Sequence, residues 1–86
     1  MVNGLVWDEW NKEHLTKHGI TIEEVEEVCH GKHEARKSYR KRILLIGKTK
    51  RGRLIAIVLS PEDKYLKRYE NGFYYVITAF DKEVYL

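Results

Sequence analysis

Two short apolar runs lie in the middle of the chain, at residues 43–47 and 54–59, on either side of a cationic turn. Runs of this length around a glycine-containing turn predict an antiparallel β-hairpin, in which Gly52 is free to take a positive φ angle. The apolar positions are consecutive and do not alternate with polar ones, which is typical of central strands with little solvent on either face. The hairpin is therefore expected to form the core of the fold.

The segment before the hairpin has the spacing of two helices. Glu9–His18 predicts a first helix, which begins after an Asp8 N-cap and ends at Gly19, in the left-handed position that favours glycine. Ile20 would then contact Leu15 as the apolar closure of a Schellman motif. A tight bend is expected here, so that the second helix begins at once.

A capping box predicts the start of the second helix. Thr21 and Glu24 have the spacing at which the side chain of each caps the backbone of the other. The helix is expected over Ile22–His30, with its apolar side chains inward and its glutamates largely outward, and Gly31 ends it.

The remaining segments predict a small sheet. Residues 5–7 predict an edge strand, and residues 33–41 a polar link with the start of a strand near Tyr39. Residues 61–69 begin with the pattern of a helix start, whereas Asn71 and Gly72 form a typical hairpin turn. We expect a short helical or irregular segment that ends at Asn71 and Gly72. Residues 73–80 predict the last strand, and residues 81–86 a turn. We expect a single α+β domain over residues 1–86, with two N-terminal helices packed on a small antiparallel sheet of three to four strands.

Composition excludes several classes of protein. Hydrophobic residues make up 43% of the chain and charged residues 34%, which is typical of a globular domain and not of a disordered chain. The longest apolar runs are far shorter than the roughly 20 residues that cross a membrane, and the N-terminus has no secretory-signal pattern. Cys29 is the only cysteine, so we expect no internal disulfide, and a cytoplasmic protein that does not bind membranes.

Charge is strongly segregated along the chain. Residues 1–31 hold two lysines against seven acids, residues 32–53 hold ten lysines and arginines against one acid, and the whole chain has a net charge of +3. The basic block attracts polyanions, of which nucleic acid is the commonest in cells. The alternative is a solvated face that the acidic helix of the same chain, or an acidic partner, neutralises.

Several short motifs, taken in order, resemble the BrnT-like toxin family. They are residues 6–11 (VWDEWN), 17–21 (KHGIT) and 23–28 (EEVEEV), then residues 42–49 (RILLIGKT) with Gly52, Arg53 and Leu54, and finally residues 75–79 (YVITA). The match covers most of the chain except residues 61–72. The resemblance implies a fold akin to the RelE-type ribonuclease toxins, cleavage of RNA without a metal or other cofactor, and neutralisation by an antitoxin that also binds operator DNA.

The sequence departs from that family near its C-terminal end. Many relatives have an arginine where this chain has Phe80, and they continue into a helix where this chain has only residues 81–86. Residues 61–72 also form a longer connection than usual. These differences favour a second hypothesis, a catalytically degenerate family member that binds RNA or a protein without cutting.

Candidate residues follow from what metal-independent RNA cleavage requires, namely a base for the 2′-hydroxyl, cations for the phosphate and an acid for the leaving 5′-oxygen. Arginine grips two phosphate oxygens at once, which makes Arg42, Arg51 and Arg53 the first choices for phosphate contacts. His18 is the leading acid or base, because the dipole at a helix C-terminus favours its protonated form. We therefore expect catalysis from His18, Arg42 and Arg53, with further RNA contacts from Lys17, Tyr39, Arg40, Lys48, Lys50 and Arg51.

The same residues have structural interpretations. The turn cations would simply be solvated, His18 would stabilise the end of its helix, and Tyr39 would be a half-buried strand residue. His33 and Glu34 are further candidates for a base near phosphate, against the alternative of plain loop residues.

Other chemistries have less support in the sequence. His14 and His18 have the i, i+4 spacing of a zinc site, but no glutamate or second cysteine completes it, so no metal site is expected. Trp7 and Trp10 are expected to be core anchors, against the alternative of base-stacking platforms, and Cys29 is expected to be core filler. A DNA-binding regulator is disfavoured because the second helix exposes glutamates that phosphates would repel. Exposed edge strands would allow a homo-oligomer.

Overall fold

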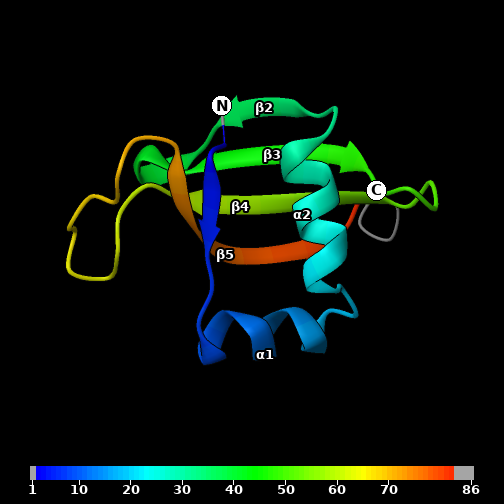
Figure 1. Ribbon diagram of the computed structural model, residues 1–86, viewed down its shortest axis with the longest axis horizontal. Coiled ribbons are helices and arrows are strands. Elements are labelled where there is room, and N and C mark those ends of the chain that lie inside the picture. The colour runs from blue at the N-terminus through cyan, green and yellow to red at the C-terminus, as the bar shows by residue number, and fades with distance from the viewer. Residues whose placement is uncertain (1, 83–86) are drawn as a thin grey trace.

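A computed structural model of the chain describes residues 2–82, which form two helices and a five-stranded sheet (Figure 1). In chain order the elements are β1 (Gly4–Val6), α1 (Glu9–Lys17), α2 (Ile22–His30), β2 (Glu34–Lys37), a short 3₁₀ turn η1 (Tyr39–Lys41), β3 (Ile43–Lys48), β4 (Leu54–Ser60) and β5 (Phe73–Asp81). The strand order is β1-β5-β4-β3-β2, with β1 parallel to β5 and all other neighbours antiparallel. The α+β class is confirmed, but the expected antiparallel sheet of three to four strands is wrong, because the sheet is mixed and has five.

The two-helix unit forms as its capping signals indicate. Gly19 has a φ angle of +69°, and the N–H of Ile20 donates to the carbonyl of Leu15 at 3.1 Å, which is the long bond of a Schellman motif. Thr21 and Glu24 form the reciprocal capping box at the start of α2. The prediction is confirmed here because each signal acts within a few residues.

The core lies between α2 and the sheet. Figure 1 shows α2 across one face of the sheet, where it packs against β3, and α1 beside β5. Ile55, Ile57 and Leu59 point to this face from alternate positions of β4 and are fully buried. They meet the buried helix residues Leu15, Ile20, Val25, Val28 and Cys29. Burial of this apolar surface is the main force that holds the helices on the sheet.

Gly47 marks the closest approach of β3 to α2. A Cβ atom at this position would lie 2.9 Å from the carbonyl oxygen of Lys32, 2.9 Å from the Cγ1 atom of Val28 and 3.2 Å from the Cβ atom of His33. Two of these neighbours belong to the backbone or the buried core, so they have little room to move. The sequence therefore needs a residue without a side chain at this point of contact.

We expect Gly47→Ala to lower the free energy of unfolding by about 1–2 kcal/mol, the usual cost of overpacking a tight site. Urea denaturation followed by circular dichroism measures the change. Lys48→Ala, at the next and exposed position of β3, is the control and should change stability little. An alanine variant as stable as the parent would contradict the close approach.

The connecting segments agree with their predictions only in part. The polar link at residues 33–41 contains β2, whose four residues are all exposed, and η1. Tyr39 lies in η1 and is 75% exposed, so the strand expected to start there, with Tyr39 as a half-buried strand residue, is wrong. Residues 61–72 form turns without a helix, so the irregular alternative is confirmed. β5 extends to Asp81, and the expected turn over residues 81–86 falls mostly on residues 83–86, outside the described part. Between residues 2 and 82, no helix has the length and apolar character needed to cross a membrane.

Candidate functional site

The hairpin separates the candidate residues into two groups. β3 runs from Ile43 to Lys48, so Arg42 lies at one end of the sheet and the β3–β4 turn lies at the other. Six strand residues span roughly 20 Å, too far for side chains at the two ends to grip one phosphate. The structure therefore places Tyr39, Arg40 and Arg42 at one end, and Lys48, Lys50, Arg51 and Arg53 at the other.

Arg53 is held within the fold by several hydrogen bonds. Its Nε atom donates to the Asp81 carboxylate at 2.9 Å, and its Nη1 atom donates to the Gly19 carbonyl at 2.9 Å and to the Glu24 carboxylate at 3.2 Å. The bond to Asp81 raises the pKa of Arg53 further above its ordinary value, and the bond to Glu24 adds to this against an opposing effect of burial. The guanidinium that we expected on RNA phosphate thus joins α1, α2 and β5, and we assign Arg53 a structural role.

His18 and Lys17 lie at the turn end of the molecule, away from Arg42. His18 is the C-cap of α1 and directly precedes Gly19, whose carbonyl accepts the bond from Arg53. Both side chains are exposed, and the His18 ring meets the His14 ring edge-on, with centroids 5.0 Å apart. The structure thus brings His18 near Arg53 but does not bring either to Arg42.

The cations of the β3–β4 turn face the acidic side of α2. The backbone N–H of Lys50 donates to the Glu27 carboxylate at 3.0 Å. Arg51 lines a small hollow of about 340 Å³ together with the carboxylates of Glu23, Glu24 and Glu27. A polyanion that approached this end would meet glutamates as well as cations. The glutamates of α2 thus neutralise part of the positive charge of the turn.

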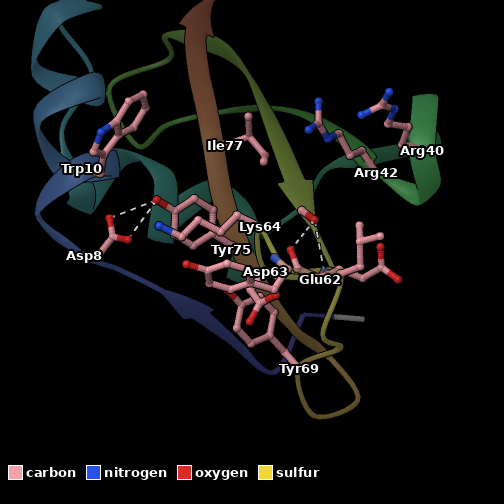
Figure 2. A pocket seen from close by; sticks show the side chains of 13 residues that line it. Asp8, Trp10, Arg40, Arg42, Glu62, Asp63, Lys64, Tyr69, Tyr75 and Ile77 are labelled. Atoms are coloured by element: carbon pink, nitrogen blue, oxygen red, sulfur yellow. Dashed lines mark hydrogen bonds between the residues drawn. The ribbon is translucent and has the colours of Figure 1, made fainter.

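A larger groove of about 800 Å³ lies at the Arg42 end (Figure 2). Its walls come from the region around η1, the start of α1, the end of β4, the 61–72 segment and the first half of β5. The lining residues are Asp8, Trp10, Arg40, Arg42, Ser60, Glu62, Asp63, Lys64, Tyr65, Leu66, Tyr69, Tyr75 and Ile77. The groove thus combines cationic side chains with a tryptophan and three tyrosines.

Sheet register places Arg42, Ser60 and Tyr75 in one row across three strands. Ser60 pairs with Tyr75, and Arg42 directly precedes Ile43, which pairs with Leu59. Neighbouring strands lie about 4.8 Å apart, so the backbones of Arg42 and Tyr75 are about 10 Å apart. Their side chains lie on the face opposite the core, because successive strand residues alternate between faces. A guanidinium and a phenol therefore face the same groove across Ser60.

Tyr75 is hydrogen-bonded to a carboxylate inside the groove. Its hydroxyl donates to Asp8, with both carboxylate oxygens at 3.0 Å (Figure 2). Burial, followed by the bond to Asp8, raises the pKa of Tyr75 to about 12. The phenol therefore keeps its proton at neutral pH and is able to donate it to a strongly basic oxygen.

Titration of Tyr75 should be visible in both absorbance and stability. An ordinary tyrosine has a pKa near 10, so between about pH 10 and 12 the unfolded chain loses this proton while the folded chain keeps it. The contribution of Tyr75 to stability is therefore present below pH 10 and is lost as the pH rises to 12. Urea denaturation over this range should show a shallower loss for Tyr75→Phe, and its phenolate absorbance should lack the component near pH 12. Equal pH profiles for the two proteins would contradict the assignment.

The carboxylates of the groove already have partners. Asp63 accepts the backbone N–H groups of Tyr65 and Lys67, and Glu62 lies 3.7 Å from the ammonium of Lys41. By contrast, the guanidinium groups of Arg40 and Arg42 form no ion pair with any residue between 2 and 82, and Arg40 lies 5.5 Å from the centre of the Tyr39 ring. Lys64 also lines the groove without an ion pair between residues 2 and 82, and its ammonium lies 5.3 Å from the centre of the Tyr65 ring. These three cations are therefore available to an anionic ligand.

Backbone strain gathers at the same groove. Within the described residues, the non-glycine residues with a positive φ angle are Arg40 (57°), Lys41 (66°) and Leu66 (65°). Arg40 and Leu66 line the groove, and Lys41 directly precedes Arg42. A left-handed conformation costs such residues roughly 1–2 kcal/mol each, and conformations of this kind cluster at functional sites. Backbone strain therefore distinguishes this end of the molecule independently of its charge.

Sequence reasoning missed much of this groove. Asp8 was predicted only as a helix cap, and Tyr75 only as part of a strand. Trp10 was predicted to be a core anchor, which is wrong, since 72% of its surface is exposed. Trp7 is part-buried against the core, and its indole N–H donates to Glu26 at 3.0 Å. The unusual number of tyrosines after residue 64 was the one available signal for an aromatic surface.

The chain matches no protein-family description, no curated protein and no solved structure.

Proposed function

We propose that the chain binds single-stranded RNA in the groove and cleaves it without a metal, as the toxin of a toxin–antitoxin pair. The observation that carries the proposal is the presence, in one groove, of several aromatic rings and two guanidinium groups that form no ion pair within residues 2–82. Single-stranded nucleic acid is bound by this combination, because cations track the phosphates while bases stack on aromatic faces.

Arg42, Arg40 and Tyr75 would carry the chemistry. The 2′-oxygen attacks the neighbouring phosphorus, a 2′,3′-cyclic phosphate forms, and the bond to the 5′-oxygen breaks. Arg42 and Arg40 stabilise the charge that develops on the phosphate oxygens. Tyr75 has a single hydroxyl proton, so it breaks its hydrogen bond to Asp8 when it donates that proton to the leaving 5′-oxygen. The proton of the 2′-hydroxyl passes to solvent, and the Tyr75 phenolate takes a proton back from solvent.

A second candidate function is RNA binding without cleavage. None of the imidazoles described between residues 2 and 82 lines the groove, and the proposed catalytic His18 lies at the other end of the molecule. A groove with phosphate-binding and stacking groups but no imidazole would still hold RNA. In both cases a cognate antitoxin would cover the groove, and a RelE-like relationship remains part of the proposal.

The test is incubation of the purified chain with a labelled single-stranded RNA in the presence of a chelator. Cleavage to products with 2′,3′-cyclic phosphate ends supports the first function, and a single deoxynucleotide at the cleaved position should block it. Saturable binding with intact RNA supports the second. RNA that is neither bound nor cut, with and without ribosomes, would rule out both.

A further inference from the structure

Three aromatic side chains form a ladder along α1. Trp10, His14 and His18 are four residues apart, so they lie on one side of the helix. The rings of Trp10 and His14 are nearly parallel, with 16° between their planes and 5.9 Å between centroids, and the His14 ring meets the His18 ring edge-on. The core is built instead on Asn11 and Leu15, which are both buried. The ladder therefore lies beside the buried side of α1 and not within it.

The ladder begins inside the groove. Trp10 lines the groove and is exposed over 72% of its surface, although tryptophan is the largest apolar side chain available for a core. Eight residues separate Trp10 from His18, which corresponds to about 12 Å along the helix axis. This length equals about three bases at a stacking distance of roughly 3.4 Å. The exposed rings thus continue the groove by a few nucleotides.

The geometry of the first two rings suits an inserted base. A base held between two rings requires about 6.8 Å, or two stacking distances. The centroids of the Trp10 and His14 rings are 5.9 Å apart, so the gap between their planes is no wider than this and must open by at least about 1 Å. Trp10 is largely exposed, so rotation of its side chain can open the gap.

Charge along the ladder also fits a phosphate backbone. At 100° per residue, Lys17 lies about 60° from the centre of the ladder, whereas Glu13 lies about 100° away and both Lys12 and Glu9 lie on the far side. Lys17 is exposed and is thus the charged residue of α1 that is closest in angle to the rings. A strand whose bases stack on the ladder would place its phosphates beside this cation.

We infer that α1 extends the groove as a stacking track for single-stranded RNA, with bases on Trp10, His14 and His18 and a phosphate on Lys17. The inference rests on the proposed RNA-binding function, and it gives His18 and Lys17 a role in substrate binding. The substrate is then an extended single strand that continues several nucleotides beyond the groove. A duplex does not fit this track, because its bases are already stacked on each other.

The experiment compares two RNA lengths by fluorescence anisotropy. A trinucleotide fills the groove alone, and an octanucleotide also reaches the ladder. His14→Ala and His18→Ala should each weaken octanucleotide binding roughly tenfold and leave trinucleotide binding unchanged. His14→Phe keeps an aromatic face and should retain octanucleotide affinity. Lys17→Ala should weaken octanucleotide binding and lower the salt dependence by about one phosphate contact.

Matched controls lie on the same helix. Lys12→Ala removes an exposed lysine on the far side, and Thr16→Ala truncates an exposed residue there, so neither should change binding of either RNA. If the octanucleotide binds the histidine variants as well as it binds the parent, or binds no better as a single strand than as a duplex, the ladder is not a track. If Arg42→Ala leaves binding of both RNA lengths unchanged, the groove is not the RNA-binding site. That result contradicts the proposed function and is distinct from a failure of the ladder.

Discussion

Replacing Arg42 by alanine is expected to slow RNA cleavage by roughly 100- to 1,000-fold while the fold remains intact. Arg42 has no ion pair within the described residues and shares a row of the sheet with Tyr75. It is therefore free to bind the reacting phosphate, and loss of one such charge-stabilising donor has an effect of this size in other enzymes. Single-turnover cleavage of a labelled RNA measures the rate, and circular dichroism reports the fold.

Arg51→Ala is the matched control for Arg42→Ala. Both substitutions remove one arginine from the same hairpin, but Arg51 is exposed at the turn end, in a hollow lined by glutamates. We expect cleavage by the Arg51 variant to stay within about twofold of the parent rate. Equal losses of cleavage rate in the two variants would mean that the net charge matters and the position of the arginine does not. That result would contradict the groove as the cleavage site. RNA that all three proteins bind equally tightly and leave intact would favour the second candidate function.

Arg53→Ala is expected to lower the free energy of unfolding by about 3 kcal/mol. The substitution leaves the carboxylates of Glu24 and Asp81 and the carbonyl of Gly19 without their shared donor. Removing one partner of a buried ion pair costs about 3–5 kcal/mol, and the low end applies because 31% of the Arg53 side chain is exposed. Urea denaturation followed by circular dichroism measures the loss.

A second substitution shows whether the lost ion pairs are the cause. In the Arg53→Ala background, Glu24→Gln removes one of the two carboxylate charges that Arg53 had paired and should restore part of the stability. Arg51→Ala should change stability by less than about 0.5 kcal/mol. An Arg53→Ala protein that is as stable as the parent but inactive would contradict the structural role. It would support the expected contact between Arg53 and the RNA phosphate. A loss of toxicity in cells that express this variant does not by itself identify a catalytic residue.

The accuracy of the sequence predictions follows the range over which each signal acts. The helices, their caps and the hairpin depend on residues within a few positions of one another, and all of them form. β2 escaped prediction because its four residues are exposed and three of them are charged, and its pairing with β3 is its main support. The parallel pairing of β1 with β5 joins Gly4 to Phe73, and no local pattern indicates such a partner.

The groove was harder to predict than the fold because its residues come from distant segments. Tyr75 and Asp8 are 67 positions apart in the chain, and neither has an unusual neighbourhood in the sequence. The spacing of α1 places Trp10, His14 and His18 on one side of the helix and Leu15 on an adjoining side, but it does not say which side faces the core. For Arg53 the sequence shows only a cation beside a basic turn, and its two carboxylate partners, Glu24 and Asp81, come from segments that no local pattern links to it.

The pairing of β1 with β5 also has a consequence for the order of folding. The β3–β4 hairpin closes a short loop, whereas β1 can join β5 only after the chain has closed a loop that spans most of its length. Non-local pairing of this kind is slow, because the chain loses the entropy of loop closure before the stabilising contacts form. We therefore expect the Asp8–Tyr75 bond, and with it one wall of the groove, to form late in folding. Detachment of β1 would break this bond and open that wall while the hairpin is still folded.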